Sequence, residues 1–181
     1  MIRKISHKPE LCPEVINYIH NIVDSPDTEV LDFGRRGPGI GDEFLKQKQF
    51  AKLHISNQDT SLDNNYQGVQ RSYQNIICHR FLHTTADYNR CIQQLFKMLS
   101  QRGSLFLSAR STDCQEYTNR NKYIQNNVFE NNFKYIKFFM NNEINQLVTN
   151  AGFAVIEDGA FTETSRFARK ENSYNYAIAV K

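Results

Sequence analysis

Several residue types that restrict a protein's class are scarce in this 181-residue sequence. It has no tryptophan, four prolines and four cysteines, and no apolar run approaches the length of a membrane span. The cysteines, Cys12, Cys78, Cys91 and Cys114, form no C-x-x-C pair, which argues against a zinc site and, in a cytosolic setting, against disulfides. The N-terminus also lacks the apolar core of a signal peptide. We therefore expect a cytoplasmic protein with reduced cysteines and no membrane association.

Charge of one sign is not concentrated anywhere in the chain. Lysine and arginine total 22, aspartate and glutamate 19, and the net charge is +3. The basic residues are spread among acids, so the pattern does not demand a nucleic-acid partner, and a small anionic substrate would account for the balance. The length suits one domain over residues 1–181, and a hydrophobic fraction of 40% argues against disorder.

Glycine is also scarce, yet four of the eight glycines fall between positions 34 and 41. They follow an apolar strand predicted over residues 29–33, and a helix is predicted over residues 41–50. Glycines allow positive φ and a close approach of the backbone to a ligand, and the helix N-terminus supplies unpaired N–H groups. The spacing is neither G-x-G-x-x-G nor a P-loop. The turn predicts a ligand site at the carboxyl end of this strand.

Strands and helices alternate along the rest of the sequence. Helices are predicted over residues 13–23, 86–100 and 142–150, the second ending near Gly103 and the third capped by Gly152. Strands are predicted over residues 52–56, 74–79, 104–108, 153–157 and 174–180, whereas the asparagine-rich residues 119–132 predict a polar segment outside the core. This order predicts an α/β fold with a mostly parallel sheet and an antiparallel C-terminal strand.

The turn Leu31-Asp32-Phe33-Gly34, together with this element order, resembles the class I S-adenosylmethionine-dependent methyltransferases. Residues 75–83 resemble the fourth strand of these enzymes and the segment after it, beside the methyl donor. The resemblance implies a Rossmann-like methyltransferase sandwich with S-adenosylmethionine as cofactor. The cofactor-binding residues that it implies are Asp32, Gly34, Gly37, Gly39 and Asp59. Residues 80–83, 109–111 and 167–170 are similar to a bacterial subgroup associated with capsule and polysaccharide synthesis.

The sequence also departs from the family pattern. The family has a second strand ending in a ribose-binding acid, then a helix and a third strand, but here one strand–helix unit is missing before Asn75. Asp59 is the one well-placed acid, and it fits the adenine side better than the ribose side. Arg35 and Arg36 stand where the family has a small residue and glycine. They would either contact the cofactor's carboxylate or a phosphate, or lie solvated on the surface.

Polar residues after the later strands are candidates for catalysis and acceptor binding. His83 is a candidate general base, and Arg80 a clamp for a carboxylate or phosphate, although a histidine here could equally cap a helix or fill the sheet edge. Arg110, Tyr135 and Lys137 are candidates for binding the acceptor. His54 and His79 alternate within strand-like runs and are expected to be structural.

Three functions fit these observations. The first is methyl transfer to an oxygen or nitrogen of a small polar, anionic or sugar-linked acceptor, in which alignment supplies most of the acceleration. The second is a catalytically inactive relative that serves as a partner or regulatory subunit, which the missing unit and the altered turn favour. The third is an RNA-binding domain of the same fold, which the mild positive charge supports weakly. A missing unit would expose apolar sheet, so a homodimer or a protein partner is also expected.

Overall fold

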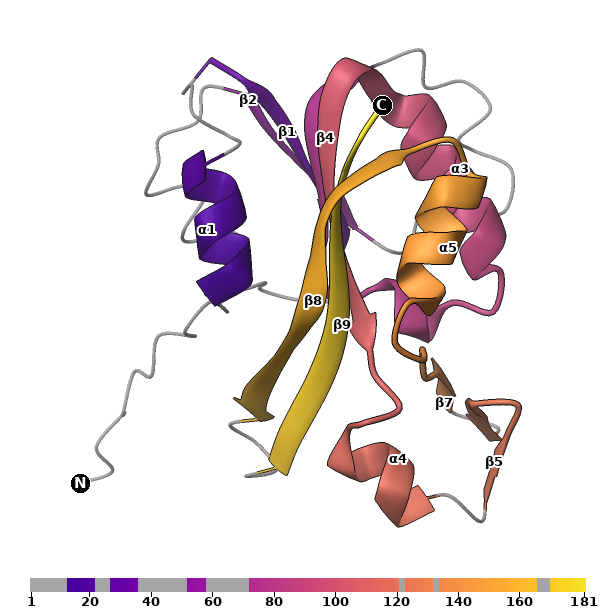
Figure 1. The fold of residues 1–181 in the computed structure, drawn as a ribbon. Helices are drawn as coiled ribbons and strands as arrows, with labels where there is room; N and C mark the ends of the chain where they lie inside the picture. Colours follow the sequence, from indigo (N-terminus) through magenta and orange to yellow (C-terminus); the bar gives the residue numbers. More distant parts are fainter. Residues whose placement is uncertain are drawn as a thin grey trace, which may run out of the picture.

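The computed structural model describes residues 13–21, 27–35, 52–57, 72–120, 123–131, 134–165 and 170–181 (Figure 1). The helix predicted over residues 41–50 lies outside these ranges. In chain order the elements are α1 Pro13–Asn21, β1 Glu29–Arg35, β2 Lys52–Asn57, β3 Tyr73–Cys78, the 3-10 helix η2 Leu82–Thr84, α3 Tyr88–Met98, β4 Leu99–Arg110, α4 Gln115–Arg120, β5 Ile124–Gln125, β6 Val128–Asn131, β7 Lys134–Lys137, α5 Glu143–Asn150, β8 Ala154–Ser165 and β9 Lys170–Val180.

Six of the strands form one sheet in the order β2-β1-β3-β4-β9-β8. The first four strands run parallel, whereas β9 is antiparallel to both β4 and β8. The strand predicted before the glycine turn therefore lies inside the sheet, between β2 and β3, and the C-terminal strand is inserted antiparallel, as the sequence predicted. This is the α/β methyltransferase-type arrangement that we expected.

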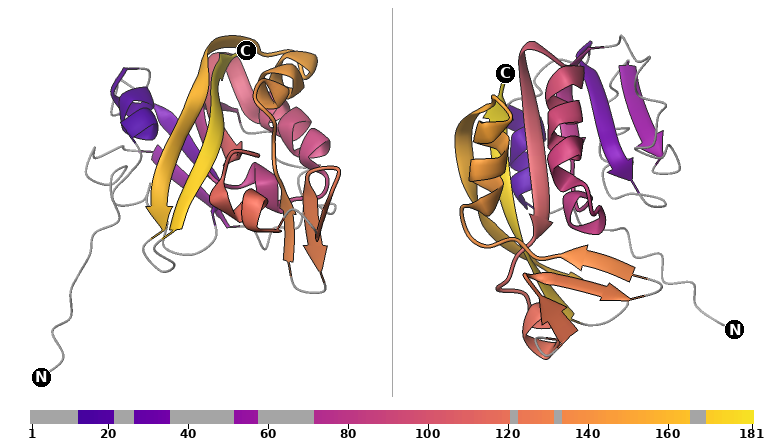
Figure 2. Two further views of the ribbon diagram at one scale, coloured as in Figure 1. Left: turned by 60° about the horizontal axis from the view of Figure 1, so that its bottom comes forward. Right: turned by 90° about the vertical axis from the view of Figure 1, so that its right-hand side faces the viewer.

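Helices cover the two faces of this sheet. Helix α1 lies on one face, and α3 and α5 lie side by side on the other (Figures 1 and 2). On the first face, Tyr18 and Ile19 of α1 pack with Phe106 of β4 in one apolar cluster. On the second face, Leu95 of α3 and Val148 of α5 belong to a larger cluster. The side chains of β3 and β4 are buried against both layers because parallel strands at the middle of a sandwich are covered twice.

The junction between α3 and β4 differs from the sequence prediction. The helix ends at Met98, and the chain passes directly into β4 at Leu99, so Gly103 is not a helix cap but lies within the strand. Arg102 just before it has φ 62°, and a Cβ at Gly103 would lie 2.8 Å from Leu99 Cγ, so the glycine permits a tight bend here. The predicted cap at Gly152, with φ 103°, is confirmed after α5.

The asparagine-rich segment also differs from its prediction. Residues 119–132 contribute to α4 and to a second, three-stranded antiparallel sheet, β5-β6-β7. Phe129, Ile136, Phe138 and Cys114 form a small buried cluster within this unit. A few apolar residues placed between polar ones thus form the buried core of this unit. The unit lies beyond the carboxyl end of β4, where it covers the edge of the large sheet (Figure 1).

Strand β2 is an edge strand of the described sheet, which has six strands. The expected loss of one strand–helix unit concerns residues 58–71, between β2 and β3, which lie outside the described ranges. Among the helices that the structure describes, none has the length and apolar character needed to cross a bilayer.

Among the described side chains of α1, Tyr18 and Ile19 are the buried ones, which gives a test of this layer. Ile19 is fully buried, whereas Asn17 on the same helix is exposed. We expect Ile19→Ala to lower the free energy of unfolding by about 2–5 kcal/mol, because it leaves a cavity beneath the helix. Asn17→Ala should change it by less than about 0.5 kcal/mol. Urea unfolding of both variants measures the difference, and equal losses would contradict the placement of α1.

Candidate functional site

The carboxyl ends of β1, β3 and β4 meet at one edge of the sheet. Near the end of β1, Asp32 is 8% exposed and Gly34 has φ 76°, a conformation that side chains rarely adopt. A Cβ built at Gly34 would overlap the ring of Phe81, which follows β3 and packs edge-on against Phe33 with centroids 5.4 Å apart. Gly34 is therefore required for the contact between β1 and the segment after β3. Gly37, Gly39 and Asp59 lie outside the described residues.

The turn after β3 is held by a serine of β4. Arg80 has φ 59°, and its backbone N–H donates to Ser108 Oγ at 3.1 Å. The same Oγ lies 2.8 Å from His79 Nδ1. Because Ser108 is fully buried, one hydroxyl thus satisfies two groups of the turn. The strain of a left-handed arginine is supported by hydrogen bonds from the neighbouring strand.

The side chains of this turn contact a glutamate of β8, an edge strand of the sheet. Arg80 forms an ion pair with Glu163 of β8, and His79 Nε2 lies 3.7 Å from Glu163 Oε1. The guanidinium carbon of Arg80 lies 5.7 Å from the ring centroid of Tyr174, on β9. Arg80, which the sequence predicts to clamp a substrate anion, is therefore paired with a carboxylate of its own chain. The sequence analysis did not identify Glu163, Ser108 or Tyr174.

Burial and pairing set the protonation of this cluster. Burial lowers the pKa of His79 and outweighs its interaction with Glu163, so the imidazole is neutral at pH 7. Burial alone would raise the pKa of Glu163, but the neighbouring imidazole of His79, 3.7 Å away, and the charge of Arg80 outweigh it and hold that pKa below its usual value. We assign the His79 proton to Nε2, facing Glu163, because Ser108 can then donate to Nδ1 while accepting from the Arg80 amide.

The other two predicted cations are paired in the same way. Arg110, at the end of β4, forms an ion pair with Glu116 of α4. Lys137 of β7 lies 2.9 Å from Glu143 of α5 and is 6% exposed. Each of the three candidate cations therefore has a glutamate from a different element beside it. The charges of Arg80, Arg110 and Lys137 are thus compensated within the chain.

His83 and the predicted acceptor residues of β7 lie on adjacent elements. His83 is buried in η2, with its ring 6.1 Å from that of Tyr174. Strand β7, which carries Tyr135 and Lys137, lies against η2. Burial raises the pKa of Tyr135, so its phenol stays protonated over the neutral range. The structure thus brings the candidate base and two candidate acceptor residues to one region.

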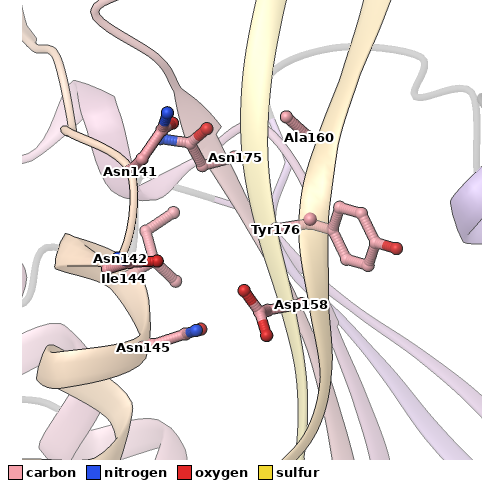
Figure 3. Close-up of a pocket in the computed structure, with 9 residues that line it drawn as sticks. Asn141, Asn142, Ile144, Asn145, Asp158, Ala160, Asn175 and Tyr176 are labelled. Carbon is pink, nitrogen blue, oxygen red and sulfur yellow. The ribbon is translucent and has the colours of Figure 1, made fainter.

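A polar groove of about 280 Å³ lies between α5 and the β8–β9 pair. Asn141, Asn145, Asp158 and Asn175 line it, whereas Tyr176 points to the opposite side of the strands (Figure 3). Asn175 Nδ2 donates to the Phe139 carbonyl at 3.0 Å, which fixes one wall. The groove lies on the α5 face of the sheet, so it is separate from the cluster around Arg80.

The lowered pKa of His79 gives a pH prediction. The unfolded histidine, with a pKa near 6.5, takes up a proton that the folded state resists, so the free energy of unfolding should fall as pH drops from 7 to 5. One such group accounts for a slope of at most about 1.4 kcal/mol per pH unit. His79→Gln should lose this contribution, whereas His20→Gln, at an exposed position of α1, should keep it. Urea unfolding across this range measures the slopes, and equal acid sensitivity of wild type and His79→Gln would contradict the assignment.

Comparison with known proteins places this geometry in a family. The model of a methyltransferase domain matches residues 5–158. No curated protein matches the sequence. Among solved structures, a SAM-dependent methyltransferase from Methanosarcina mazei superposes with a TM-score of 0.70 at 16% identity, covering 96% of this chain and 99% of that one. The 1,6-didemethyltoxoflavin-N1-methyltransferase of Burkholderia thailandensis, which holds its substrate and S-adenosylhomocysteine, gives 0.62 at 13% identity over 93% and 76%.

These structural matches are too distant in sequence to show more than a shared fold. That fold is the one of SAM-dependent methyltransferases, and the family model covers most of the chain, including β1, β3 and β4, but ends before Glu163 and Tyr174. The chain therefore belongs to the methyltransferase domain family, a family of enzymes.

Proposed function

We propose that this chain transfers a methyl group from S-adenosylmethionine to an oxygen or nitrogen of a small polar acceptor. The observation that carries the proposal is the strand order at the centre of the sheet. From β1 the chain continues to β2 on one side and then returns to β3 on the other, so the order reverses between β1 and β3. In open α/β sheets, ligands bind outside the carboxyl ends of the strands at such a reversal. Gly34 and the Arg80–Phe81 turn lie at that point.

The residues at this reversal fit the methionine end of the donor. Gly34 leaves the backbone without a Cβ, and Asp32, two residues before it on β1, provides a carboxylate. Gly37 and Gly39 would continue this wall, and Asp59 would meet the adenine end. The donor supplies an already activated methyl group as a sulfonium. The protein then has to align it with the acceptor atom, with modest help from a base.

His83 is our candidate for that base, and Arg110, Tyr135 and Lys137 are our candidates for binding the acceptor. The compensation of the cations supports an uncharged acceptor rather than a free anion, because an anion would have to compete with Glu116 or Glu143. A hydroxyl of a sugar-linked molecule, as in polysaccharide synthesis, fits this requirement. Arg80, already paired with Glu163, is better suited to holding the turn than to binding the acceptor.

The second candidate is a catalytically inactive methyltransferase-like partner or regulatory subunit. The strand–helix unit that the sequence predicts to be missing on the ribose side, and the arginines Arg35 and Arg36 in the glycine turn, support it. A second copy or another protein would then cover the β2 edge.

Cys78, Cys91 and Cys114, which are all buried free thiols, fit a single domain that works in the reducing cytoplasm.

Thermal melting with S-adenosylhomocysteine separates these two functions. Ligand at 100 times its dissociation constant should stabilise the protein by about 2.7 kcal/mol. Asp59→Ala should weaken binding by about 1.5–3 kcal/mol if that carboxylate accepts a hydrogen bond from the adenine amine. No shift at millimolar ligand would support the inactive partner, and an unchanged dissociation constant in Asp59→Ala would remove Asp59 from the site.

The charge of the acceptor can be tested with inorganic phosphate as a probe. Glu143→Gln removes the carboxylate beside Lys137 but keeps an oxygen that can accept the Met140 N–H, so the start of α5 is preserved. We expect phosphate to shift the amide resonances around Lys137 in this variant at about tenfold lower concentration than in wild type. Glu130→Gln, an exposed position on β6, should behave like wild type. Equally strong phosphate binding to wild-type protein would argue for an anionic acceptor.

A further inference from the structure

We propose that Glu163 is a positioning residue: it fixes the turn between β3 and η2 and thereby sets the shape of the crevice between β1 and β3. The role of that crevice in donor binding rests on the proposed function, whereas the effect of Glu163 on the turn does not. No feature of the family resemblance predicted a role for this residue, which lies 83 positions from its partner Arg80.

Glu163 lies on a part of the C-terminal hairpin that extends past the sheet. Pairing of β4 with β9 ends at Arg110 and Tyr174, but β8 and β9 stay paired as far as Ser165 and Lys170. The hairpin therefore projects beyond the carboxyl ends of the parallel strands (Figure 1). This projection is what allows an acid of the outermost strand to reach a turn that follows β3.

The contacts of Glu163 converge on two consecutive residues of that turn. Its carboxylate pairs with the Arg80 guanidinium through one oxygen, and its other oxygen faces His79. Glu163 is 12% exposed, so this pairing is shielded from solvent more than a surface salt bridge would be. Tyr174 lies beside both cation and imidazole, 5.7 Å from the Arg80 guanidinium carbon and with its ring centroid 6.5 Å from that of His79. The titratable, charged and hydroxyl groups around His79 among the described residues are thus Glu163, Arg80, Ser108 and Tyr174, and the rings of Phe106 and Phe161 complete its surroundings.

The backbone conformation of Arg80 explains why its ion pair with Glu163 affects the shape of the turn. Its left-handed φ of 59° is unfavourable for a residue with a side chain and persists only where contacts impose it. Ser108 holds the amide, and Glu163 holds the side chain. The next residue, Phe81, packs onto Gly34. A change in the turn would therefore move the ring that forms one wall at the end of β1.

A salt bridge that only stabilised the fold would behave differently. Its loss would lower protection against amide exchange across the core of the sheet by a common factor, because the protein would unfold globally more often. Loss of a positioning contact would instead raise exchange at the turn alone. The amides of Arg80 and Ile76, the latter in the buried middle of β3, distinguish the two cases.

The test compares Glu163→Gln with Glu157→Gln in ligand-free protein by hydrogen exchange measured with NMR. Glu157 is an exposed acid of the same strand whose carboxylate accepts a hydrogen bond from Tyr176 at 2.8 Å, so it is a matched control. We expect Glu163→Gln to speed exchange of the Arg80 amide about tenfold or more and to leave Ile76 unchanged. Glu157→Gln should leave both unchanged. Uniform acceleration, or no change at Arg80, would overturn the proposal.

A second arm measures S-adenosylhomocysteine binding by calorimetry. Glu163→Gln should weaken binding about tenfold, and Glu163→Asp should recover part of the loss, because a carboxylate is restored at shorter reach. Glycine accepts a left-handed φ without strain, so in an Arg80→Gly background Glu163→Gln should cause no further loss. A further tenfold loss in that background would overturn the proposed route through Arg80. If wild-type protein fails to bind the probe, the proposed function fails, and the exchange arm still decides the role of Glu163.

Discussion

The contact between Phe81 and Gly34 is the constraint on which the candidate site depends. It joins the end of β1 to the segment after β3, the two strands between which the chain order reverses. Its geometry requires a glycine at one position and a left-handed arginine next to the other. The left-handed arginine is a local strain, and contacts with the surrounding sheet maintain it. The crevice is thus formed by the packing of two strand ends rather than by the glycine turn alone.

Compensation of charge is the second general property of this edge. Arg80, Arg110 and Lys137 come from three different segments, and their glutamate partners come from β8, α4 and α5. Partly buried cations without partners would cost free energy, so each pairing also helps dock its element onto the sheet. The small β5–β7 sheet and the C-terminal hairpin are connected to the centre in this way. The same pairings mean that a ligand anion would have to compete with a glutamate for each of these three cations.

Membership of the methyltransferase domain family and this arrangement support each other. The family model covers the strands that form the edge, and structures that share the fold include one with S-adenosylhomocysteine bound. Family membership does not specify the acceptor. The residues that we propose for binding it are Arg110, at the end of β4, and Tyr135 and Lys137 on β7.

The sequence alone was sufficient for the order of β1, β2, β3, α3, β4, α5, β8 and β9, the central place of β1, the antiparallel C-terminal strand and the cap at Gly152, because periodicity and glycine position are local signals. It failed at Gly103, where β4 begins earlier than its apolar run suggests, and at the asparagine-rich segment, where Phe129 packs with Cys114, Ile136 and Phe138 from the flanking residues. Only the tertiary structure decided that Arg80 pairs with Glu163. Because these two residues are 83 positions apart, no periodicity in the sequence indicates their contact. The contact forms only because the sheet brings β8 past the end of β3.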